Sequence, residues 1–394
     1  MYIYIITFLI TILLIWLAEN KIKYPKNKKL LLILAIVPMF LISAIRYNVG
    51  TDYSKRYVAD YYTLSEGKDV ENLEIGFKAI DYLCLFFTKE PYLLFVVTSL
   101  IILSIIFEVI YHKSPNKILS ISIFFLGGYF FASLNIIRQY IAFALILLGY
   151  QFLMSENKKK AYIGFIICAI LAFLMHSSSI ICFIILILTN KKIMDAKWVI
   201  PLGILILILN KNIMVILTPI IKNTRFNVYL TGKFTAGELS ILQIAENLII
   251  YLGMYFIYHF ENKQGKEMDK QGITLLNIQG VALLLIVSGV IHTLFIRMAV
   301  YFVAFQIISI PYFLSILQFD KITNVINDKF KKNLKDKTIE VIVYSCIVLG
   351  FSAMFIYTNI LNNDNEVLPY KTIFSIEEVN SKGKGYGEKK ICKY

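Results

Sequence analysis

The chain has 394 residues, of which 58% are hydrophobic and only 17% are charged, and its mean hydropathy is +0.68. A soluble globular protein carries about 25% charged residues, so this composition excludes a water-soluble enzyme, a disordered chain and a disulfide scaffold. The net charge of +14 would suggest nucleic-acid binding in a soluble protein. Here the long apolar runs indicate a membrane protein, and no nucleic-acid partner is expected.

Apolar runs long enough to cross a bilayer recur along most of the chain. Such a span needs about 20 residues and must be helical, because lipid cannot hydrogen-bond an exposed backbone. The sequence therefore predicts an all-α, polytopic membrane protein with about twelve spans, forming one domain over residues 1–358 before a polar tail at 359–394. The predicted spans are 2–18, 30–45, 91–111, 118–135, 137–154, 161–175, 177–189, 198–220, 241–260, 272–292, 297–318 and 338–358.

Lysines mark one side of this topology. With twelve spans, all six lysine-rich loops fall on the same side, which the positive-inside rule makes cytoplasmic. These loops are 19–29, 112–117, 155–160, 190–197, 261–270 and 319–337. Both termini are then outside, with long outer loops at about 46–90 and 221–240. The first outer loop is rich in tyrosine, and its residues 75–83 have the pattern of an amphipathic helix lying on the membrane surface.

All five arginines fall on the side opposite the lysines: Arg46, Arg56, Arg138, Arg225 and Arg297. A guanidinium near the bilayer is costly unless it is paired or faces a polar cavity, and its planar fork suits phosphate better than an ammonium does. Several arginines converging at the outer surface would clamp a diphosphate. The alternative is that each one merely reaches up to the lipid head groups.

Two histidines and one aspartate are candidates for proton transfer. His176 lies between two short apolar halves, and His292 lies five residues before Arg297. A histidine titrates near neutrality and can act as a base, but each could equally be a hydrogen-bonded break in a helix. Asp52 could orient an arginine or activate a sugar hydroxyl, or could simply cap a turn.

Tyr47 and Tyr53 belong to the tyrosines that follow Arg46, and they could stack on sugar rings or anchor the chain at the interface. Several motifs are absent from the sequence. There is no Walker A motif and no Cys/His spacing of a zinc site, so no cofactor and no metal are expected.

Four stretches together resemble the EpsG family of bacterial exopolysaccharide proteins, which is similar to the Wzy-type repeat-unit polymerases. A fifth stretch, FIRMAVYF at 295–302, resembles the family more weakly. The four are RYNVGTDY at 46–53, EIGFKAIDYL at 74–83, NIIRQYIAFALILLGYQF at 135–152, with Arg138-Gln139 opening a helix, and FLMHSSSII at 173–181.

The resemblance implies a GT-C-like, multi-pass protein of the bacterial plasma membrane that joins oligosaccharide units carried on undecaprenyl diphosphate. Capsule, exopolysaccharide and O-antigen synthesis use such metal-independent glycosyltransferases. The implied partners are the lipid-linked oligosaccharide, membrane lipids, and a chain-length regulator and a flippase of the same pathway.

The implied reaction gives the candidate residues roles. Arg46, Arg138 and Arg297 would stabilise the leaving diphosphate, and His176 or Asp52 would handle the proton of the attacking hydroxyl. Substrate-binding roles would fall to Tyr47, Tyr53, Arg56, Gln139, Arg225 and His292.

Three other functions remain open at this point. A lipid-linked oligosaccharide flippase or exporter would also be a multi-span chain, but it should line a midplane cavity with charge. A structural subunit would need no converging Arg/His set. A membrane O-acyltransferase would place histidine and aspartate on a re-entrant segment, as His176 allows.

Overall fold

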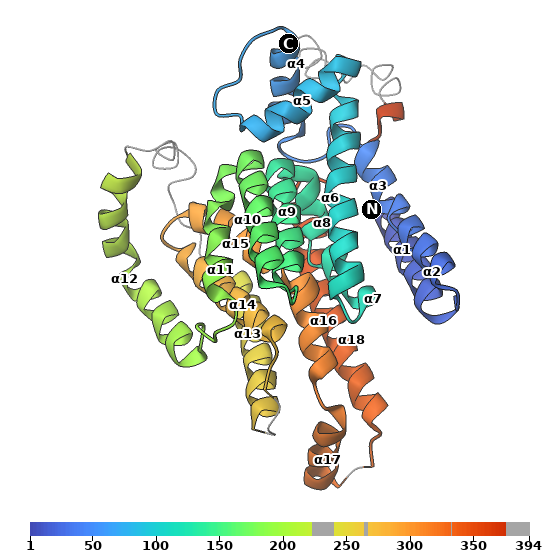
Figure 1. The fold of residues 1–394 in the computed structure, drawn as a ribbon, viewed down its shortest axis with the longest axis vertical. Helices are drawn as coiled ribbons and strands as arrows, with labels where there is room; N and C mark the ends of the chain where they lie inside the picture. Colours follow the sequence, from blue (N-terminus) through green and yellow to red (C-terminus); the bar gives the residue numbers. More distant parts are fainter. Residues whose placement is uncertain (223–239, 264–266, 332, 376–394) are drawn as a thin grey trace.

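The computed structural model describes residues 1–222, 240–263, 267–331 and 333–375, and these are almost entirely helical (Figure 1). The N-terminal half contains α1 (Tyr2–Asn20), α2 (Pro25–Leu34), α3 (Val37–Ala44), η1 (Tyr53–Val58), α4 (Ala59–Ser65), α5 (Ile75–Phe87), α6 (Tyr92–Lys113), α7 (Lys117–Leu126), α8 (Tyr129–Asn135), α9 (Ile137–Leu153) and α10 (Lys158–Met175). The C-terminal half contains η2 (Ser177–Phe183), α11 (Ile184–Leu188), α12 (Ala196–Lys222), α13 (Ile241–Asn262), α14 (Lys270–Ser288), α15 (Thr293–Val303), α16 (Gln306–Ile316), α17 (Phe319–Phe330), α18 (Asp336–Phe355), η5 (Ile356–Leu361) and η6 (Ile373–Ser375).

Within the described residues, seven helical segments are long and apolar enough to cross a membrane, or nine if each of two bent helix pairs counts as one span. The prediction of an all-helical, polytopic membrane protein is confirmed, whereas the count of about twelve spans and the GT-C likeness are not. The seven are Tyr2–Asn20, Pro25–Ala44, Tyr92–Lys113, Ala196–Ile213, Ile241–Asn262, Lys270–Ser288 and Asp336–Leu361.

The two bent pairs explain part of the difference in span count. The chain turns by 53° between α7 and α8, and by 47° between α15 and α16. Gly128 makes the first bend possible because its φ of +78° lies in the left-handed region, which a side chain disfavours. The two bends lie against each other, since the Tyr129 hydroxyl donates a 2.6 Å hydrogen bond to Gln306 just beyond the second bend.

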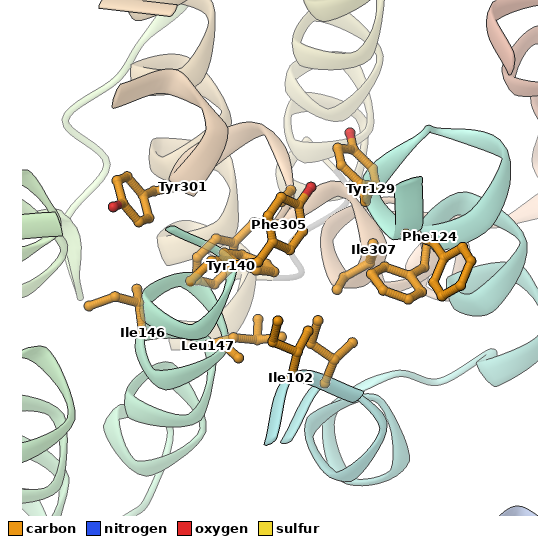
Figure 2. Packing of buried hydrophobic residues seen from close by; sticks show 14 of the residues in the cluster. Ile102, Phe124, Tyr129, Tyr140, Ile146, Leu147, Tyr301, Phe305 and Ile307 are labelled. Atoms are coloured by element: carbon orange, nitrogen blue, oxygen red, sulfur yellow. The ribbon is translucent and has the colours of Figure 1, made fainter. Parts of the chain in front are cut away.

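The core is built around α9, which is buried along most of its length. It packs against α6 and α10, and its Phe143 and Tyr150 rings contact Phe305 at the bend between α15 and α16. Large aromatic and branched side chains fill it, and Figure 2 shows Tyr140 and Phe305 packed beside Ile102 and Leu147. Because α9 is held on several sides, its N-terminal turn is a rigid platform. The outer helices instead keep exposed apolar faces, as lipid contact requires.

The predicted break at His176 is confirmed. The helix α10 ends at Met175, His176 is extended with φ −156°, and a tighter helical turn follows. The predicted amphipathic helix also forms, as α5: Phe77, Ile80 and Cys84 are buried, while Phe86 and Phe87 are exposed.

The lysine-rich loops and the α4–α5 region lie at opposite ends of the molecule. Figure 1 shows the α1–α2 turn, the beginning of α12 and the end of α13 toward the lower end, and α4 and α5 at the upper end. At the upper end the segment before α4 also meets the C-terminal part of the described chain. Arg46 pairs with Thr372 through a backbone bridge, so residues 359–375 are not separate from the helical body.

Candidate active site

Glu74 is the centre of an ion cluster that joins three segments far apart in the chain. Its carboxylate lies 2.6 Å from Arg138 Nη1 and 3.1 Å from His176 Nδ1. The backbone N–H and the hydroxyl of Ser177 each donate to the same carboxylate at 3.3 Å. The side chains of Glu74 and Arg138 are about nine-tenths buried, and that of His176 is 23% exposed. The cluster is therefore sheltered, with the imidazole as its most accessible member.

Local backbone features bring these side chains together. Glu74 is the last extended residue before α5, Arg138 stands in the first turn of α9, and His176 directly follows α10. Gly76 lets α5 approach the end of α10, because a Cβ there would lie only 2.8 Å from the carbonyl oxygen of Leu174. A larger residue at position 76 would push Glu74 away from His176.

The charges of the cluster favour an ionised Glu74. Burial alone would raise the pKa of this carboxyl, but the hydrogen bond from His176 and the charge of Arg138 outweigh it and lower the pKa to about 2. Glu74 is therefore a carboxylate at any physiological pH, fixed between a guanidinium and an imidazole. A carboxylate that accepts from Nδ1–H leaves the Nε2 of the imidazole able to take a proton.

The helix α15 forms a further wall of the same site. The hydroxyls of Ser178 and Tyr301 lie 3.0 Å apart, and Tyr301 is fully buried (Figure 2). Gln139 donates a 2.5 Å hydrogen bond to the carbonyl oxygen of Arg297, which ties the first turn of α9 to α15. The side chain of Arg297 is exposed. The predicted residues Arg138, Gln139, His176 and Arg297 thus come from segments that meet here.

Asp81 adds a second, unpaired acid beside the cluster. It is 1% exposed, and neither carboxylate oxygen has a hydrogen-bond partner among the described residues. Burial, and then the nearby Asp60, raise its pKa to about 8, while Arg138 lowers it in part. Asp81 is therefore largely protonated at neutral pH.

A model of the EpsG family matches residues 29–372 of the chain. This protein belongs to the EpsG family. The match covers all of the residues just described, from Glu74 to Tyr301. No curated protein and no solved structure matches the chain.

In this EpsG-family protein Arg46 has a different environment from Arg138. It is 1% exposed, and its guanidinium donates to the carbonyl oxygens of Ser43 and Leu134 and lies 4.7 Å from the centre of the Phe95 ring. In the described part of the chain it forms no ion pair. Its hydrogen bonds join the end of α3 to α8, which is a stabilising arrangement.

The segment after Arg46 uses its side chains mainly for packing. Tyr53 is 2% exposed, stacks on Phe95 at 4.2 Å, and donates to the carbonyl oxygen of Arg46. Tyr47 is half-buried and makes an edge contact with Tyr53. The backbone N–H of Asp52 donates to Asn135, which places Asp52 just before the first turn of α9.

Arg56, His292 and Arg225 complete the predicted set. Arg56 is 3.9 Å from Asp60 and its side chain is 42% exposed. His292 is 1% exposed and caps α15, because its Nδ1 accepts from the backbone N–H of Leu294. Arg225 lies outside the described residues. Among the described residues, no group of three or more His, Cys, Asp or Glu side chains is arranged to hold a metal ion.

Glu74 is the functional candidate that the sequence analysis missed. The only signal was its place at the start of the EIGFKAIDYL stretch, directly before an amphipathic helix. An acid there is usually a helix cap, and its true partners are 64 and 102 residues away in the chain. Tyr301 was missed for the same reason, since an aromatic residue in an apolar helix reads as core.

Proposed function

We propose that this EpsG-family protein is a membrane glycosyltransferase that joins oligosaccharide repeat units carried on undecaprenyl diphosphate, as in capsule, exopolysaccharide or O-antigen synthesis. The proposal rests on one observation above all: Glu74 holds an arginine and a histidine together at the start of α9. That set has the groups that transfer from a lipid diphosphate needs, which are a cation for the leaving group and a base for the acceptor.

In the proposed reaction, a hydroxyl oxygen of one unit attacks the anomeric carbon of another. A new C–O bond forms, the bond from the anomeric carbon to the diphosphate oxygen breaks, and the diphosphate leaves with the electron pair. Arg138 stabilises the charge that grows on the diphosphate. Arg297 of α15 is the second candidate for this role, because its backbone carbonyl accepts from Gln139, the residue after Arg138. Two lipid-linked substrates held side by side supply the proximity that the reaction needs.

His176 takes the proton of the attacking hydroxyl in this scheme. Glu74 accepts from Nδ1–H, which fixes the tautomer and leaves Nε2 to act as the base. Glu74 is then a positioning residue, because it acts through the imidazole. Asp52 is the second choice for the base. Its backbone contact with Asn135 places it near the start of α9.

The proposed orientation puts this site at the outer face of a bacterial plasma membrane. The lysine-rich loops would be cytoplasmic by the positive-inside rule, and α4 and α5 are at the other end of the molecule (Figure 1). The exposed apolar face of α5 would rest on the outer leaflet. The substrate would therefore be the lipid-linked oligosaccharide after its transfer across the membrane, delivered by a flippase. A chain-length regulator of the same pathway is the other expected partner.

A flippase or exporter is the second candidate, and an O-acyltransferase is the third. A transporter is expected to carry its ionisable groups in a cavity near the midplane of the membrane. The cluster of Glu74, Arg138 and His176 stands instead at helix ends, which favours chemistry at the surface. An acyltransferase would also use His176, but it would not need an arginine bound to the same carboxylate.

One assay separates these functions. Purified protein in liposomes would receive an undecaprenyl-diphosphate-linked oligosaccharide, and products would be sized on a gel. A ladder at repeat-unit spacing supports the polymerase, whereas movement of substrate across the bilayer without elongation supports the flippase. Arg138→Lys should strongly reduce the ladder, and Lys89→Gln, which removes an exposed charge between α5 and α6, should not. A full ladder from Arg138→Lys would refute the assigned role of Arg138.

A further inference from the structure

A cleft beside α9 and α10 lies at the lysine-rich end of the molecule, away from the Glu74 cluster. It measures about 470 Å³ and is lined by Phe152 of α9, Asn157 of the connecting loop, and residues of α10. A volume of this size is in the range of small-molecule and lipid sites. The α10 residues in its lining are Lys159, Lys160, Ile163, Gly164, Ile167 and Cys168.

The cleft is polar at one end only. Lys159 and Lys160 are in the first turn of α10 and are exposed, and Asn157 caps that turn by accepting from the backbone N–H of Lys160. The rest of the lining is apolar. Ile163 and Ile167 are exposed one and two turns further along the helix. A charged rim above an apolar wall matches the shape of an amphiphile standing along a helix.

Gly164 makes the wall concave. A Cβ at this position would lie 2.7 Å from the Phe152 ring, so only glycine lets this part of α10 come so close to α9. The lining from Lys159 to Cys168 spans ten residues of helix, or roughly 14 Å at a rise of 1.5 Å from each residue to the next. That depth is close to one leaflet, because the hydrocarbon core of a bilayer is about 30 Å thick.

The positive charge at the rim lacks a protein partner. In the described part of the chain neither Lys159 nor Lys160 forms an ion pair, and the adjacent Glu156 forms none either. Lys158 adds a third charge in the same turn, and Lys270 adds a fourth, since its ammonium donates a 2.6 Å hydrogen bond to the carbonyl oxygen of Leu153 at the end of α9. Four ammonium groups are thus gathered beside an apolar cleft. The second cleft at this end differs, because its Lys117 is already paired with Glu19 and because an acid, Glu108, lines it together with Lys29.

We propose that this cleft binds one anionic phospholipid of the surrounding bilayer. The phosphate of the head group contacts Lys159 and Lys160, and one acyl chain lies along Ile163, Gly164 and Ile167 against Phe152. Basic pockets between membrane helices recognise anionic head groups in this way. The lipid packs against α9 and α10 at the ends opposite Arg138 and His176. Its proposed role is therefore structural, because it does not contact the residues of the reaction.

Native mass spectrometry of the full chain tests the proposal, with phosphatidylglycerol and phosphatidylcholine as the two probes. We expect wild-type protein to retain one phosphatidylglycerol in preference to phosphatidylcholine. The double variant Lys159→Gln/Lys160→Gln should bind phosphatidylglycerol roughly 10- to 30-fold more weakly, since each lysine near an anionic head group contributes measurably. Ile163→Trp, which fills the cleft and keeps both lysines, should also lose the retained lipid.

The matched control removes the same charge elsewhere at this end of the chain. Lys329→Gln/Lys335→Gln replaces two exposed lysines around α17 and α18, and it should retain the lipid as the wild type does. Equal loss in the control would show that only the overall field attracts the lipid, and equal retention of the two probe lipids would show that no head group is recognised. Either result overturns the proposal. Size-exclusion elution and thermal unfolding verify that each variant is folded.

Discussion

Arg46 and Arg138 have similar places in the sequence and opposite environments in the structure. Each stands at the end of a predicted span on the side opposite the lysines, and both are buried. Arg46 donates to carbonyl oxygens and covers the Phe95 ring, whereas Arg138 pairs with Glu74. The main-chain carbonyls that accept from Arg46 cannot move away from its guanidinium unless the helices that carry them unfold. A carboxylate side chain can move, and it offers a guanidinium the same two oxygens that a phosphate group offers.

The largest expected difference comes from replacing each arginine by lysine. Arg138→Lys keeps the charge but loses the fork, and we expect repeat-unit transfer to fall by about 10²- to 10³-fold, the loss typical of a removed transition-state contact. Arg46→Lys puts a single ammonium in place of the two Nη atoms that donate to the two carbonyl oxygens, so we expect it to lower stability by about 2–4 kcal/mol. The measurements are product ladders per folded protein and thermal unfolding in detergent.

An exchange of these two phenotypes would contradict the roles assigned to the two arginines. If Arg46→Lys is as stable as the wild type and loses transfer, Arg46 contacts the substrate and the clamp extends to both arginines. If Arg138→Lys transfers normally and is unstable, the contact between Arg138 and Glu74 only holds α5 against α9.

The next largest effect concerns two Glu–His pairs. Glu74 and His176 are 3.1 Å apart with little exposure, while Glu108 and His112 are 2.9 Å apart on α6, each about half exposed. His176→Gln should reduce transfer by about 10²-fold as the loss of a general base. Glu74→Gln should reduce it roughly tenfold through the imidazole that it orients.

A double-mutant cycle sharpens that prediction. If Glu74 acts through His176, the double variant should be no worse than His176→Gln alone, because residues that act as a unit are not additive. The same changes at Glu108 and His112 should leave transfer unchanged. Additive losses at Glu74 and His176 would mean that the carboxylate has a separate role, such as holding Arg138.

The sequence predicts the segments of this site better than its contacts. The break at His176 and the helix that starts at Ile137 both follow from local signals, namely an interrupted apolar run and the onset of another. Glu74 does not, because its partners come from α9 and α10 and only the packing of α5 at Gly76 brings them near. The sequence does not distinguish Arg46 from Arg138 for the same reason, because the environment of each guanidinium is set by residues that are distant in the chain.

The span count shows a similar limit. The hydropathy of the sequence predicts one continuous span at 118–135 and another at 297–318. In the structure each of these runs forms two short helices with a bend between them. The bend at Gly128 depends on a backbone conformation, and the bend near Gln306 lies against it through Tyr129. Neither feature changes the average hydropathy of the run.

A smaller effect is expected in the pH dependence of stability around Glu74. Its pKa is lowered to about 2 in the folded state, so its contribution is fully present above the unfolded value near 4.5 and is lost as the pH falls toward 2. The contribution is on the order of 3 kcal/mol. The unfolding temperature of Glu74→Gln should therefore be lower than that of the wild type at pH 7 and pH 5, and the difference should shrink near pH 3. A gap of equal size at pH 3 would mean that the ionised carboxylate is not what stabilises α5.

The smallest expected effect is at Asp81, and it has the opposite sign. Its folded pKa of about 8 lies above the usual value of an aspartate, so the wild type loses stability as the pH rises from about 4 to about 8. The asparagine of Asp81→Asn does not titrate, so the stability of this variant should rise relative to the wild type across that range. The net gain at pH 8 should be only ~1 kcal/mol, because the unmet hydrogen bonds of a buried amide offset much of the benefit. Asp60→Asn should flatten the pH dependence in the wild-type background, since Asp60 is the like charge that raises the pKa of Asp81 after burial. If Asp81→Asn instead loses stability relative to the wild type steadily from pH 5 to pH 8, then Asp81 is ionised and paired with Arg138. A phosphate would then have to replace two carboxylates at Arg138 rather than one.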